Sequence, residues 1–398
     1  MNEPLAPCLE TQPSTCQCEA PTERQPVLPT STDDDVCCGP PAGPASSPYD
    51  KPGYALWPFV QGFKETAVGP VPRVKTHLER SDTLGSFKVR LGLNRNNYKI
   101  APGLYCIGDP DAKAPVVVTA NYKLTFDILR KAMAGLDAWL VVVDTRGINV
   151  WCAAGKGTFS TQEVVQRVQQ IDLQRVVQHN RLILPQLAAT GVSAQQVKKK
   201  CGFEVIWGPI RAFDIKAFLD AGFVASSRMR QVTFGLQERL VLIPVELSNI
   251  PKYVLWILLG LFLLSGIGSD IFSFEAAWNR GFMVLAALVS GILAGAVVVP
   301  ALLPWIPGVA FAVKGVLAGL VGWAFVTVFY WGQATYIESM ALLLCTAALS
   351  SFMAMNFTGA TPFTSPSGVE KEMRKAIPLQ ALAGLAALVT WVGAAFAG

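Results

Sequence analysis

The stretch that organises this chain runs from Trp139-Leu140-Val141-Val142-Val143 through Asp144-Thr145-Arg146-Gly147-Ile148 into Asn149-Val150-Trp151-Cys152-Ala153-Ala154-Gly155-Lys156-Gly157. An apolar run, a tight turn and an Asn followed by small residues predict a strand that leads into a short helix, with Asn149 as the N-cap. Cys152 then falls in the first helical turn. There the unpaired backbone N–H groups, the helix dipole and nearby Lys156 favour a thiolate over a thiol.

Two interpretations of Cys152 follow from the residues alone, and both stay open. The sulfur is either a ligand for a soft metal, or a small buried hydrophobic group behind a tight turn. Trp151 fits a core position equally well. The small residues Ala153, Ala154 and Gly155 favour the ligand interpretation, because they would let a flat macrocycle approach the backbone closely.

The bulk composition excludes a single soluble domain. The chain has 398 residues, of which 52% are hydrophobic and 15% charged, and its net charge of +5 is modest. No run of Lys and Arg indicates a nucleic-acid site. The nine cysteines are an odd number scattered over dissimilar regions, which favours a reducing compartment over a disulfide framework. Residues 1–50 show no secretory signal pattern, so we expect the N-terminal part to stay in the cytoplasm.

Three regions are expected along the chain. Residues 1–52 are rich in Pro, Ser and Thr and predict a disordered tail, whose cysteines are either plain thiols or loose ligands for a soft metal. Residues 53–250 alternate in the manner of a Rossmann-like α/β domain. The expected strands are 87–93, 103–107, 116–120, 139–143, 182–184, 204–207 and 240–245, and the expected helices are 123–134, 161–170, 193–201 and 214–221.

Residues 251–398 predict a five-helix transmembrane domain. The apolar stretches 253–269, 281–303, 309–331, 340–357 and 376–397 are each long enough to cross a bilayer. Basic residues before the first stretch and between the last two indicate an N-terminus on the cytoplasmic side. Lys314 lies near mid-depth, where a charge suggests function, so a transporter with a regulatory α/β domain remains an alternative. The close-spaced glycines from Gly315 to Gly322 favour helix packing over a pore.

The sequence lacks the motifs typical of nucleotide binding, of histidine zinc sites and of catalytic triads. The segment Ala154 to Thr158 resembles the end of a phosphate-binding loop, but Gly157 follows the Lys where Ser or Thr is required. A G-x-G-x-x-G fingerprint is missing as well. The chain has only two histidines, His77 and His179, which excludes a three-histidine zinc site and leaves no local signature for a catalytic triad.

The run from Asn149 to Gly157 resembles the cap-helix signature of the HgcA family, the membrane-bound corrinoid proteins of microbial mercury methylation. The layout resembles that family too, over about residues 55–398: a cytoplasmic corrinoid domain followed by five membrane spans. The corrinoid domain is similar to that of the corrinoid iron–sulfur protein of the acetyl-CoA pathway. This chain lacks the four-cysteine cluster motif of that relative, so its electrons must come from a partner.

The resemblance implies a corrinoid-dependent methyltransferase that converts inorganic Hg(II) to methylmercury. It makes the Cys152 thiolate the lower axial ligand of the cobalt in a bound cobalamin that carries the methyl group. It also implies a small ferredoxin partner with two [4Fe–4S] clusters, a methyltetrahydrofolate-linked methyl donor, and a location in the cytoplasmic membrane. Residues expected at the cofactor are Asn149, Val150, Trp151, Cys152, Ala153, Ala154, Gly155 and Lys156, with Asn149 capping the helix, Trp151 packing it and the small residues lying beneath the corrin.

Further corrin contacts are expected only from their place at strand ends, namely Thr119, Ala120, Asn121, Thr145 and Gly147. The alternative function is a corrinoid methyl carrier of a one-carbon or acetyl-CoA pathway. Whether the methyl group moves as a carbanion or a radical equivalent stays open.

Overall fold

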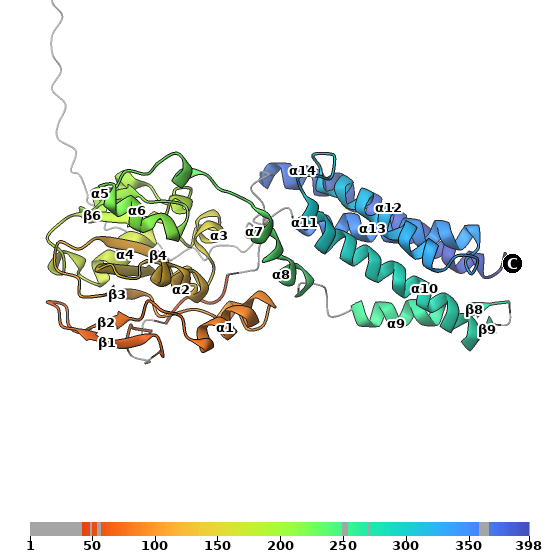
Figure 1. The fold of residues 1–398 in the computed structure, drawn as a ribbon, viewed down its shortest axis with the longest axis horizontal. Coiled ribbons are helices and arrows are strands. Elements are labelled where there is room, and N and C mark those ends of the chain that lie inside the picture. The colour runs from red at the N-terminus through yellow and green to blue at the C-terminus, as the bar shows by residue number, and fades with distance from the viewer. Residues whose placement is uncertain are drawn as a thin grey trace, which may run out of the picture. The chain divides into compact units, whose positions relative to one another are not determined.

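The computed structural model describes residues 42–47, 50–53, 57–248, 254–269, 271–357 and 366–397. The expected tail cysteines Cys8, Cys16, Cys18, Cys37 and Cys38 lie outside the described residues. Two regions follow each other along the chain, a mixed α/β sheet domain and a set of long C-terminal helices (Figure 1). The expected fold class is therefore confirmed.

The α/β domain is built on one seven-stranded sheet with the order β1-β2-β3-β5-β4-β6-β7. Strands β5, β4, β6 and β7 run parallel to one another, whereas β3 is antiparallel to β5 and β1 is antiparallel to β2. The strands are β1 (Val60–Lys64), β2 (Val71–Val74), β3 (Gly103–Ile107), β4 (Val116–Ala120), β5 (Ala138–Val143), β6 (Arg181–Leu184) and β7 (Glu204–Trp207). Five of the seven expected strands are confirmed, and β1 and β2 were not foreseen.

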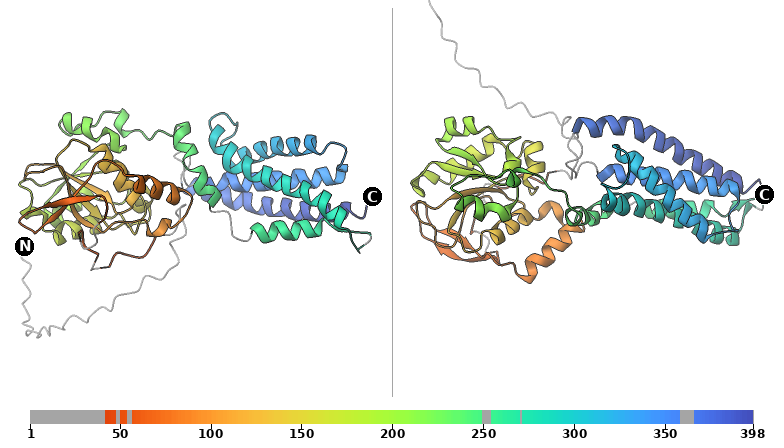
Figure 2. Two further views of the ribbon diagram at one scale, coloured as in Figure 1. Left: turned by 60° about the horizontal axis from the view of Figure 1, so that its bottom comes forward. Right: turned by 45° about the horizontal axis from the view of Figure 1, so that its top comes forward.

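Helices cover both faces of this sheet, because the central strands are apolar on both sides and must be buried twice. One face packs against α3 (Val150–Gly155), α4 (Thr161–Gln170) and α5 (Ala194–Cys201). The other face packs against α2 (Lys123–Ala132) and α6 (Ile215–Asp220). All six residues of β5 are buried, as expected for a strand in the middle of such a sandwich. The two further views show the same layers from other sides (Figure 2).

Two expected strands are wrong. Residues 87–93 belong to helix α1 (Arg80–Arg90) and the turn after it, and residues 240–245 belong to the helices α7 (Leu236–Leu240) and α8 (Ile243–Ser248) with the turn between them. In α1 the apolar residues of this stretch lie on two faces: Phe87 is 59% exposed, whereas Val89 is buried together with Asp82. Burial of a polar residue of a helix is a tertiary effect that a local pattern does not reveal.

The start of the α/β domain also differs from the expected boundary. Residues 42–47 lie in the predicted disordered tail, but they contact the folded domain. The Gly43 amide donates to the Arg146 carbonyl over 3.0 Å, and the Ser46 amide donates to Asp144 Oδ2 over 2.6 Å. Lys99 Nζ donates to the Pro44 carbonyl over 2.8 Å. This segment is therefore part of the domain and lies against the turn after β5.

Four helices among the described residues are long and apolar enough to cross a membrane: Phe274–Leu302, Phe311–Phe329, Tyr336–Asn356 and Gly368–Ala394. They correspond to the last four expected spans. The first expected span is different, because its described part forms α9 (Val254–Leu264) and then the short hairpin of β8 (Ile267–Gly268) and β9 (Ile271–Phe272). Eleven helical residues reach about 16 Å, roughly half of the hydrocarbon thickness of a bilayer.

Small residues bring the long apolar helices α12 (Phe311–Phe329) and α13 (Tyr336–Asn356) together, as the glycine spacing predicted. A Cβ on Gly315 would lie 2.5 Å from Ser351 Cα, and one on Gly319 would lie 2.9 Å from Ala347 Cα. The Ser350 hydroxyl donates to the Gly315 carbonyl over 2.7 Å. The first part of the preceding span is α10 (Phe274–Leu293), followed by the π-helical segment Ala294–Val298 and α11 (Val299–Leu302), and the last long helix is α14 (Pro366–Ala394).

Candidate functional site

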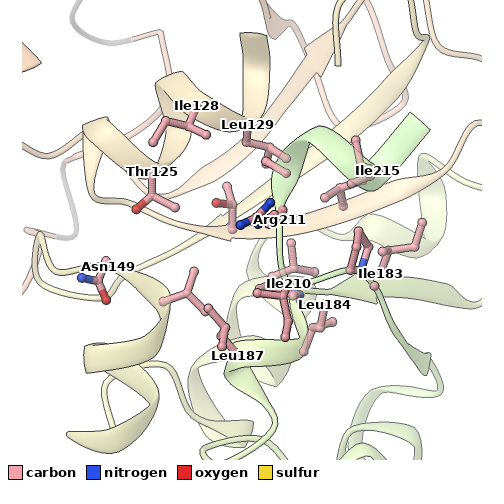
Figure 3. A pocket seen from close by; sticks show the side chains of 18 of the residues that line it. Thr125, Ile128, Leu129, Asn149, Ile183, Leu184, Leu187, Ile210, Arg211 and Ile215 are labelled. Carbon is pink, nitrogen blue, oxygen red and sulfur yellow. The ribbon is translucent and has the colours of Figure 1, made fainter. Parts of the chain in front are cut away.

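A pocket of about 330 Å³ opens at the carboxyl ends of the parallel strands β4 and β6 (Figure 3). Strand β4 pairs with β6 through Val117 and Ile183, and the residues that follow this pair on both strands line the pocket. The chain leaves β4 through α2 toward β5, whereas it leaves β6 through α5 toward β7 on the other side. The pocket is thus at the topological switch point, where open α/β sheets bind their ligands.

The pocket wall is mainly apolar. Its residues come from β4, α2, the start of α3, the end of β6, the segments after β6 and β7, and the start of α6. They are Val117, Val118, Thr119, Thr125, Ile128, Leu129, Asn149, Val150, Trp151, Ile183, Leu184, Pro185, Leu187, Gly208, Pro209, Ile210, Arg211, Ala212 and Ile215. Of the expected site residues, Thr119, Asn149, Val150 and Trp151 line it. Figure 3 shows Thr125 and Ile128 of α2 across the opening from Asn149.

The turn between β5 and α3 is held by one buried amide. Asn121, at the end of β4, is fully buried, and its Oδ1 accepts hydrogen bonds from the Thr145 amide over 3.0 Å and the Gly147 amide over 3.1 Å. The Thr145 hydroxyl lies 2.9 Å from the same oxygen and 2.7 Å from the Ile148 carbonyl. Asn121 Nδ2 donates to Asp144 over 2.8 Å. Asn121, Thr145 and Gly147 thus lie together, as expected. Their contacts with one another stabilise a turn, whereas contacts with a cofactor were expected.

The backbone of this turn requires a glycine. Arg146 and Gly147 both adopt left-handed conformations, with φ of 55° and 77°. Two such residues in succession reverse the chain within a few positions, and a side chain at Gly147 would be strained there. The Asp144 carboxylate supports the turn by accepting from the Arg146 amide over 2.9 Å. The tight turn predicted from the sequence is confirmed, and it aims the next helix at the sheet edge.

Helix α3 follows this turn with the predicted cap. Asn149 has an extended backbone, and its Oδ1 accepts a hydrogen bond from the Cys152 amide over 2.9 Å. The cap fixes the backbone of Cys152 in the first helical turn, beside Asn149, Val150 and Trp151 of the pocket wall. The Cys152 side chain is partly buried and packs in part against the core on this face of the sheet.

Two of the three small residues of α3, Ala153 and Ala154, face the core, whereas a place beneath a cofactor was expected for them. Ala153 is fully buried and Ala154 nearly so. A Cβ on Gly191 would lie 3.1 Å from Ala154 Cα and 2.3 Å from the Phe159 carbonyl oxygen, so the loop after η3 (Gln186–Ala188) packs directly on the helix backbone. Ala120 is likewise buried in this core. These alanines therefore set how closely α3 approaches the domain.

The outward side of α3 carries the other expected residues. Trp151 is 42% exposed and lines the pocket, whereas it was expected to pack the helix. Gly155 is exposed, and Lys156 is the C-cap residue. Near the pocket, α3 thus offers an aromatic ring rather than a flat surface of small residues.

The three described cysteines of the α/β domain differ in environment. Cys106 and Cys201 are buried, and burial raises the pKa of the Cys106 thiol to about 11 and also raises the pKa of Cys201. A thiol with a raised pKa is a poor nucleophile and metal ligand at neutral pH. Cys152 is the cysteine of this domain that keeps partial exposure. In the described part of the chain, His, Cys, Asp and Glu side chains form no group of three or more suited to a metal ion.

Lys314 has a structural explanation. Its side chain is buried at the start of α12, and its ammonium group donates to the carbonyls of Leu303, over 3.0 Å, and of Ile306. These carbonyls lie at and just after the C-terminal end of α11, where a helix leaves its last acceptors without partners. The ammonium group of Lys314 thus caps a helix end, which gives its burial a structural explanation.

The sequence interpretation missed the part of the pocket contributed after β6 and β7. Pro185 and Leu187 follow β6, and Ile210 and Arg211 follow β7. Contacts with a ligand were expected only at and after the ends of β4 and β5, although β6 and β7 were also predicted at the right places. The carboxyl ends of β6 and β7 lie at the same edge of the sheet, so the sequence could have indicated these residues too.

Residues 94–219 match the CO dehydrogenase/acetyl-CoA synthase delta subunit family. This region contains β3 to β7, the pocket, the turn and α3. The match covers less than half of the chain, so it describes the α/β domain and not the helices that follow it.

Curated relatives match the same part of the chain. The acetyl-CoA decarbonylase/synthase complex subunit gamma of Methanopyrus kandleri is 33% identical over 128 residues, which are 32% of this chain and 27% of that protein. The corresponding subunit of Archaeoglobus fulgidus is 30% identical over 128 residues, with the same two shares. The corrinoid/iron-sulfur protein large subunit of Moorella thermoacetica is 31% identical over 121 residues, 30% of this chain and 27% of that protein. The chain spans about a quarter of the length of these relatives.

Proposed function

We propose that the α/β domain binds a corrinoid and that the chain acts in corrinoid-dependent methyl transfer, with the Cys152 sulfur as the protein ligand of the cobalt. One observation carries the proposal: the Asn149-capped α3 holds a partly exposed cysteine beside the pocket at the switch point of the sheet. The likeness of this region to a corrinoid/iron-sulfur protein large subunit supports it.

The residues present fit a corrinoid. A thiolate is a soft ligand that would suit cobalt, and the apolar pocket wall with the exposed Trp151 would suit the apolar part of a corrin macrocycle. When bound, the corrinoid would supply a cobalt that accepts and releases a methyl group. The chain supplies the position of the sulfur: Asn149 fixes the Cys152 amide, and the Asn121 network fixes the turn before it.

The other expected site residues differ in how directly they would contact the corrinoid. Val150 and Trp151 of α3 and Thr119 of β4 line the pocket and would contact the cofactor directly. Gly155 and Lys156 lie at the end of α3, where they would border the corrin. Ala120, Asn121, Thr145, Gly147, Ala153 and Ala154 are buried, so their part is to hold the helix and its turn in place.

The methyl acceptor divides the proposal into two. The comparisons support a methyl carrier of a one-carbon or acetyl-CoA pathway more directly, because the relatives named above are subunits of such complexes or a corrinoid/iron-sulfur protein. Transfer to inorganic Hg(II), giving methylmercury, is the finer proposal and rests on the resemblance of the run from Asn149 to Gly157 to the cap helix of mercury-methylating proteins.

Partners and location belong to the same proposal. A small ferredoxin with two [4Fe–4S] clusters would supply electrons, and a methyltetrahydrofolate-linked donor would supply the methyl group. Four helices long and apolar enough to cross a bilayer support a multi-pass membrane protein. That the membrane is the cytoplasmic one, with the α/β domain in the cytoplasm, rests on the resemblance and on the positions of the basic residues. The transporter alternative loses its main support, because Lys314 is occupied by backbone carbonyls.

A methyl-transfer assay with paired acceptors tests the proposal. The full chain is loaded with methylcobalamin in detergent and offered Hg(II) or an acetyl-CoA synthase, and methyl products are measured by mass spectrometry. Transfer to either acceptor that Cys152→Ala abolishes supports the carrier function, and the acceptor used decides between the two activities. Equal transfer by Cys152→Ala and the native chain contradicts the role of the cysteine, and a chain that binds no corrinoid contradicts the proposal as a whole.

A further inference from the structure

Helix α1 presents an apolar stripe to the outside of the α/β domain. Leu84, Phe87 and Leu91 follow one another at spacings of three and four residues, which places them on one face of a helix. Their exposed fractions are 53%, 59% and 38%. Both views of Figure 2 show α1, in orange, at the periphery of this domain. Three large exposed apolar side chains in a row are unusual on a soluble surface and indicate an interaction site.

The opposite face of α1 is buried and carries Asp82 and Val89. Asp82 is buried, and its two carboxylate oxygens accept hydrogen bonds from Lys123 over 2.6 Å and Arg130 over 2.7 Å, both on α2. The helix is thus held with its apolar side outward by a buried ion cluster. Because α1 is already folded and anchored, docking it onto a surface needs no coil-to-helix transition.

Cations flank the stripe on both sides. Lys88 is one position after Phe87 and Arg90 one position before Leu91, which puts them at opposite edges of the apolar face at 100° per residue. The stretch from Arg80 to Leu91 contains one acidic residue, the buried Asp82. An apolar stripe with basic edges is the pattern of a helix that lies in the interface of an anionic membrane, since Lys and Arg reach the headgroups while the stripe enters the acyl region.

The chain keeps this helix close to a bilayer. Arg239 on α7 is buried and donates to the carbonyls of Pro300, over 3.1 Å, and Ala301, over 2.8 Å, at the end of a candidate membrane span. From the end of α6 at Asp220 to the start of α7 at Leu236 the chain can extend at most about 55 Å. With the long apolar helices in a bilayer, a membrane surface is thus tethered to the domain that carries α1, whereas a soluble partner must be recruited.

We propose that α1 is an interfacial membrane helix, which inserts Leu84, Phe87 and Leu91 into a leaflet that contains anionic phospholipid and sets Lys88 and Arg90 against the phosphates. The inference requires the membrane attachment of the proposed function but not the corrinoid. Docking in this way restricts the α/β domain to one orientation on the membrane. An acidic protein partner is the competing occupant, and the experiment separates the two.

Photo-crosslinking in proteoliposomes tests the proposal. A benzophenone analogue of phenylalanine replaces Phe87 in the full chain, and a matched chain carries it at Phe63 of β1, which is similarly exposed at 44%. With phosphatidylglycerol present, we expect several-fold more lipid adducts at position 87 than at position 63. Adducts as few at position 87 as at position 63 would overturn the proposal, as would protein adducts in place of lipid adducts when cytosol is added.

A second set of variants tests the cations. Lys88→Gln with Arg90→Gln should lower the lipid adducts at position 87 several-fold in vesicles that contain phosphatidylglycerol, and should change them little in phosphatidylcholine alone. Arg175→Gln, at an exposed ion pair elsewhere in the domain, serves as the control and should have no effect. Circular dichroism of each variant verifies the fold. Equal adduct yields for the double variant and the control would contradict the contact with anionic headgroups.

Discussion

Asn121 and Lys123 follow β4 and are two positions apart in the chain, but they belong to different buried polar networks. Asn121 belongs to an almost neutral network that holds backbone amides, those of Thr145 and Gly147, in the turn before α3. Lys123 belongs to a charged cluster with Asp82, Asp127 and Arg130, in which two ion pairs join α1 to α2 and two lie within α2. One network shapes the chain beside the pocket, and the other fastens a helix to the domain.

The difference teaches where each network can tolerate change. The charged cluster has two cations and two carboxylates, so removing any one of them takes a partner from two others at once. The Asn121 network depends on a single amide that combines an acceptor and a donor in fixed directions. We therefore expect the charged cluster to control the stability of the domain and Asn121 to control the geometry of the site.

Arg130→Leu should give the largest loss of stability. It leaves Asp82 and Asp127 buried with one cation between them, and breaking a buried ion pair in this way costs about 3–5 kcal/mol of unfolding free energy. Chemical denaturation of the full chain in detergent measures it. Arg175→Leu, at an exposed pair, is the control and should cost about 0–1 kcal/mol. Similar losses in the two variants would mean that the cluster is not the main support of α1.

Asn121→Ala should come next, with a loss of about 2–3 kcal/mol, because the buried amides of Thr145 and Gly147 lose their acceptor. Unlike Arg130→Leu, it should also weaken corrinoid binding at temperatures where the domain is still folded, since the turn that carries α3 is released. Titration with cobalamin, followed by absorbance, measures this. If Asn121→Ala bound cobalamin as tightly as the native chain, Asn121 would not control the geometry of the site.

Asn149→Ala should have a smaller effect, because one helix cap contributes about 1 kcal/mol. The Cys152 amide loses its acceptor, and the sulfur becomes less well positioned. Asn149→Asp and Asn149→Ser keep a capping oxygen and should restore both stability and the corrinoid spectrum. Failure of both replacements would show that Asn149 acts through its pocket contact and not as a cap.

The smallest expected effect is a dependence of stability on pH. Burial raises the pKa of the Asp82 carboxyl, but hydrogen bonds from Lys123, the Glu79 amide and Arg130 outweigh it and hold the pKa below its usual value. A carboxyl with a lowered pKa in the folded state stabilises the domain above its unfolded pKa, about 3.9, and this stability is lost as the pH falls through the folded pKa. Denaturation at a series of acidic pH values should therefore show a steeper loss for the native chain than for Asp82→Asn. Parallel curves would mean that Asp82 titrates alike in both states.

The sequence predicted those parts of the site that follow from local order. The run from Trp139 to Gly157 contains a buried strand, a turn with a glycine and a capped helix, and all three formed. The strand predicted at residues 87–93 is wrong because the helix there buries a polar residue and exposes an apolar one. Asp82 is buried and Phe87 is exposed in α1, so the apolar pattern did not resemble that of an ordinary amphipathic helix. The ion partners of Asp82 lie 41 and 48 positions away, and no local pattern reveals them.

Packing also decided what the small residues do. Ala153 and Ala154 are compatible with a flat ligand or with a close neighbour, and only the position of Gly191 against Ala154 shows that the neighbour is the protein itself. The first expected span failed for a similar reason, because hydropathy alone does not reveal that the helix ends at Leu264 and a hairpin follows.

The absorption spectrum of cobalamin bound to the purified full chain tests the role of Cys152 most directly. The native protein should give a spectrum that differs from free cobalamin and from cobalamin bound to Cys152→Ala, because a sulfur ligand changes the electronic transitions of cobalt. Cys152→His should give a third spectrum, typical of a nitrogen ligand. Identical spectra of the native chain and Cys152→Ala, with corrinoid bound to both, would contradict cobalt ligation by Cys152.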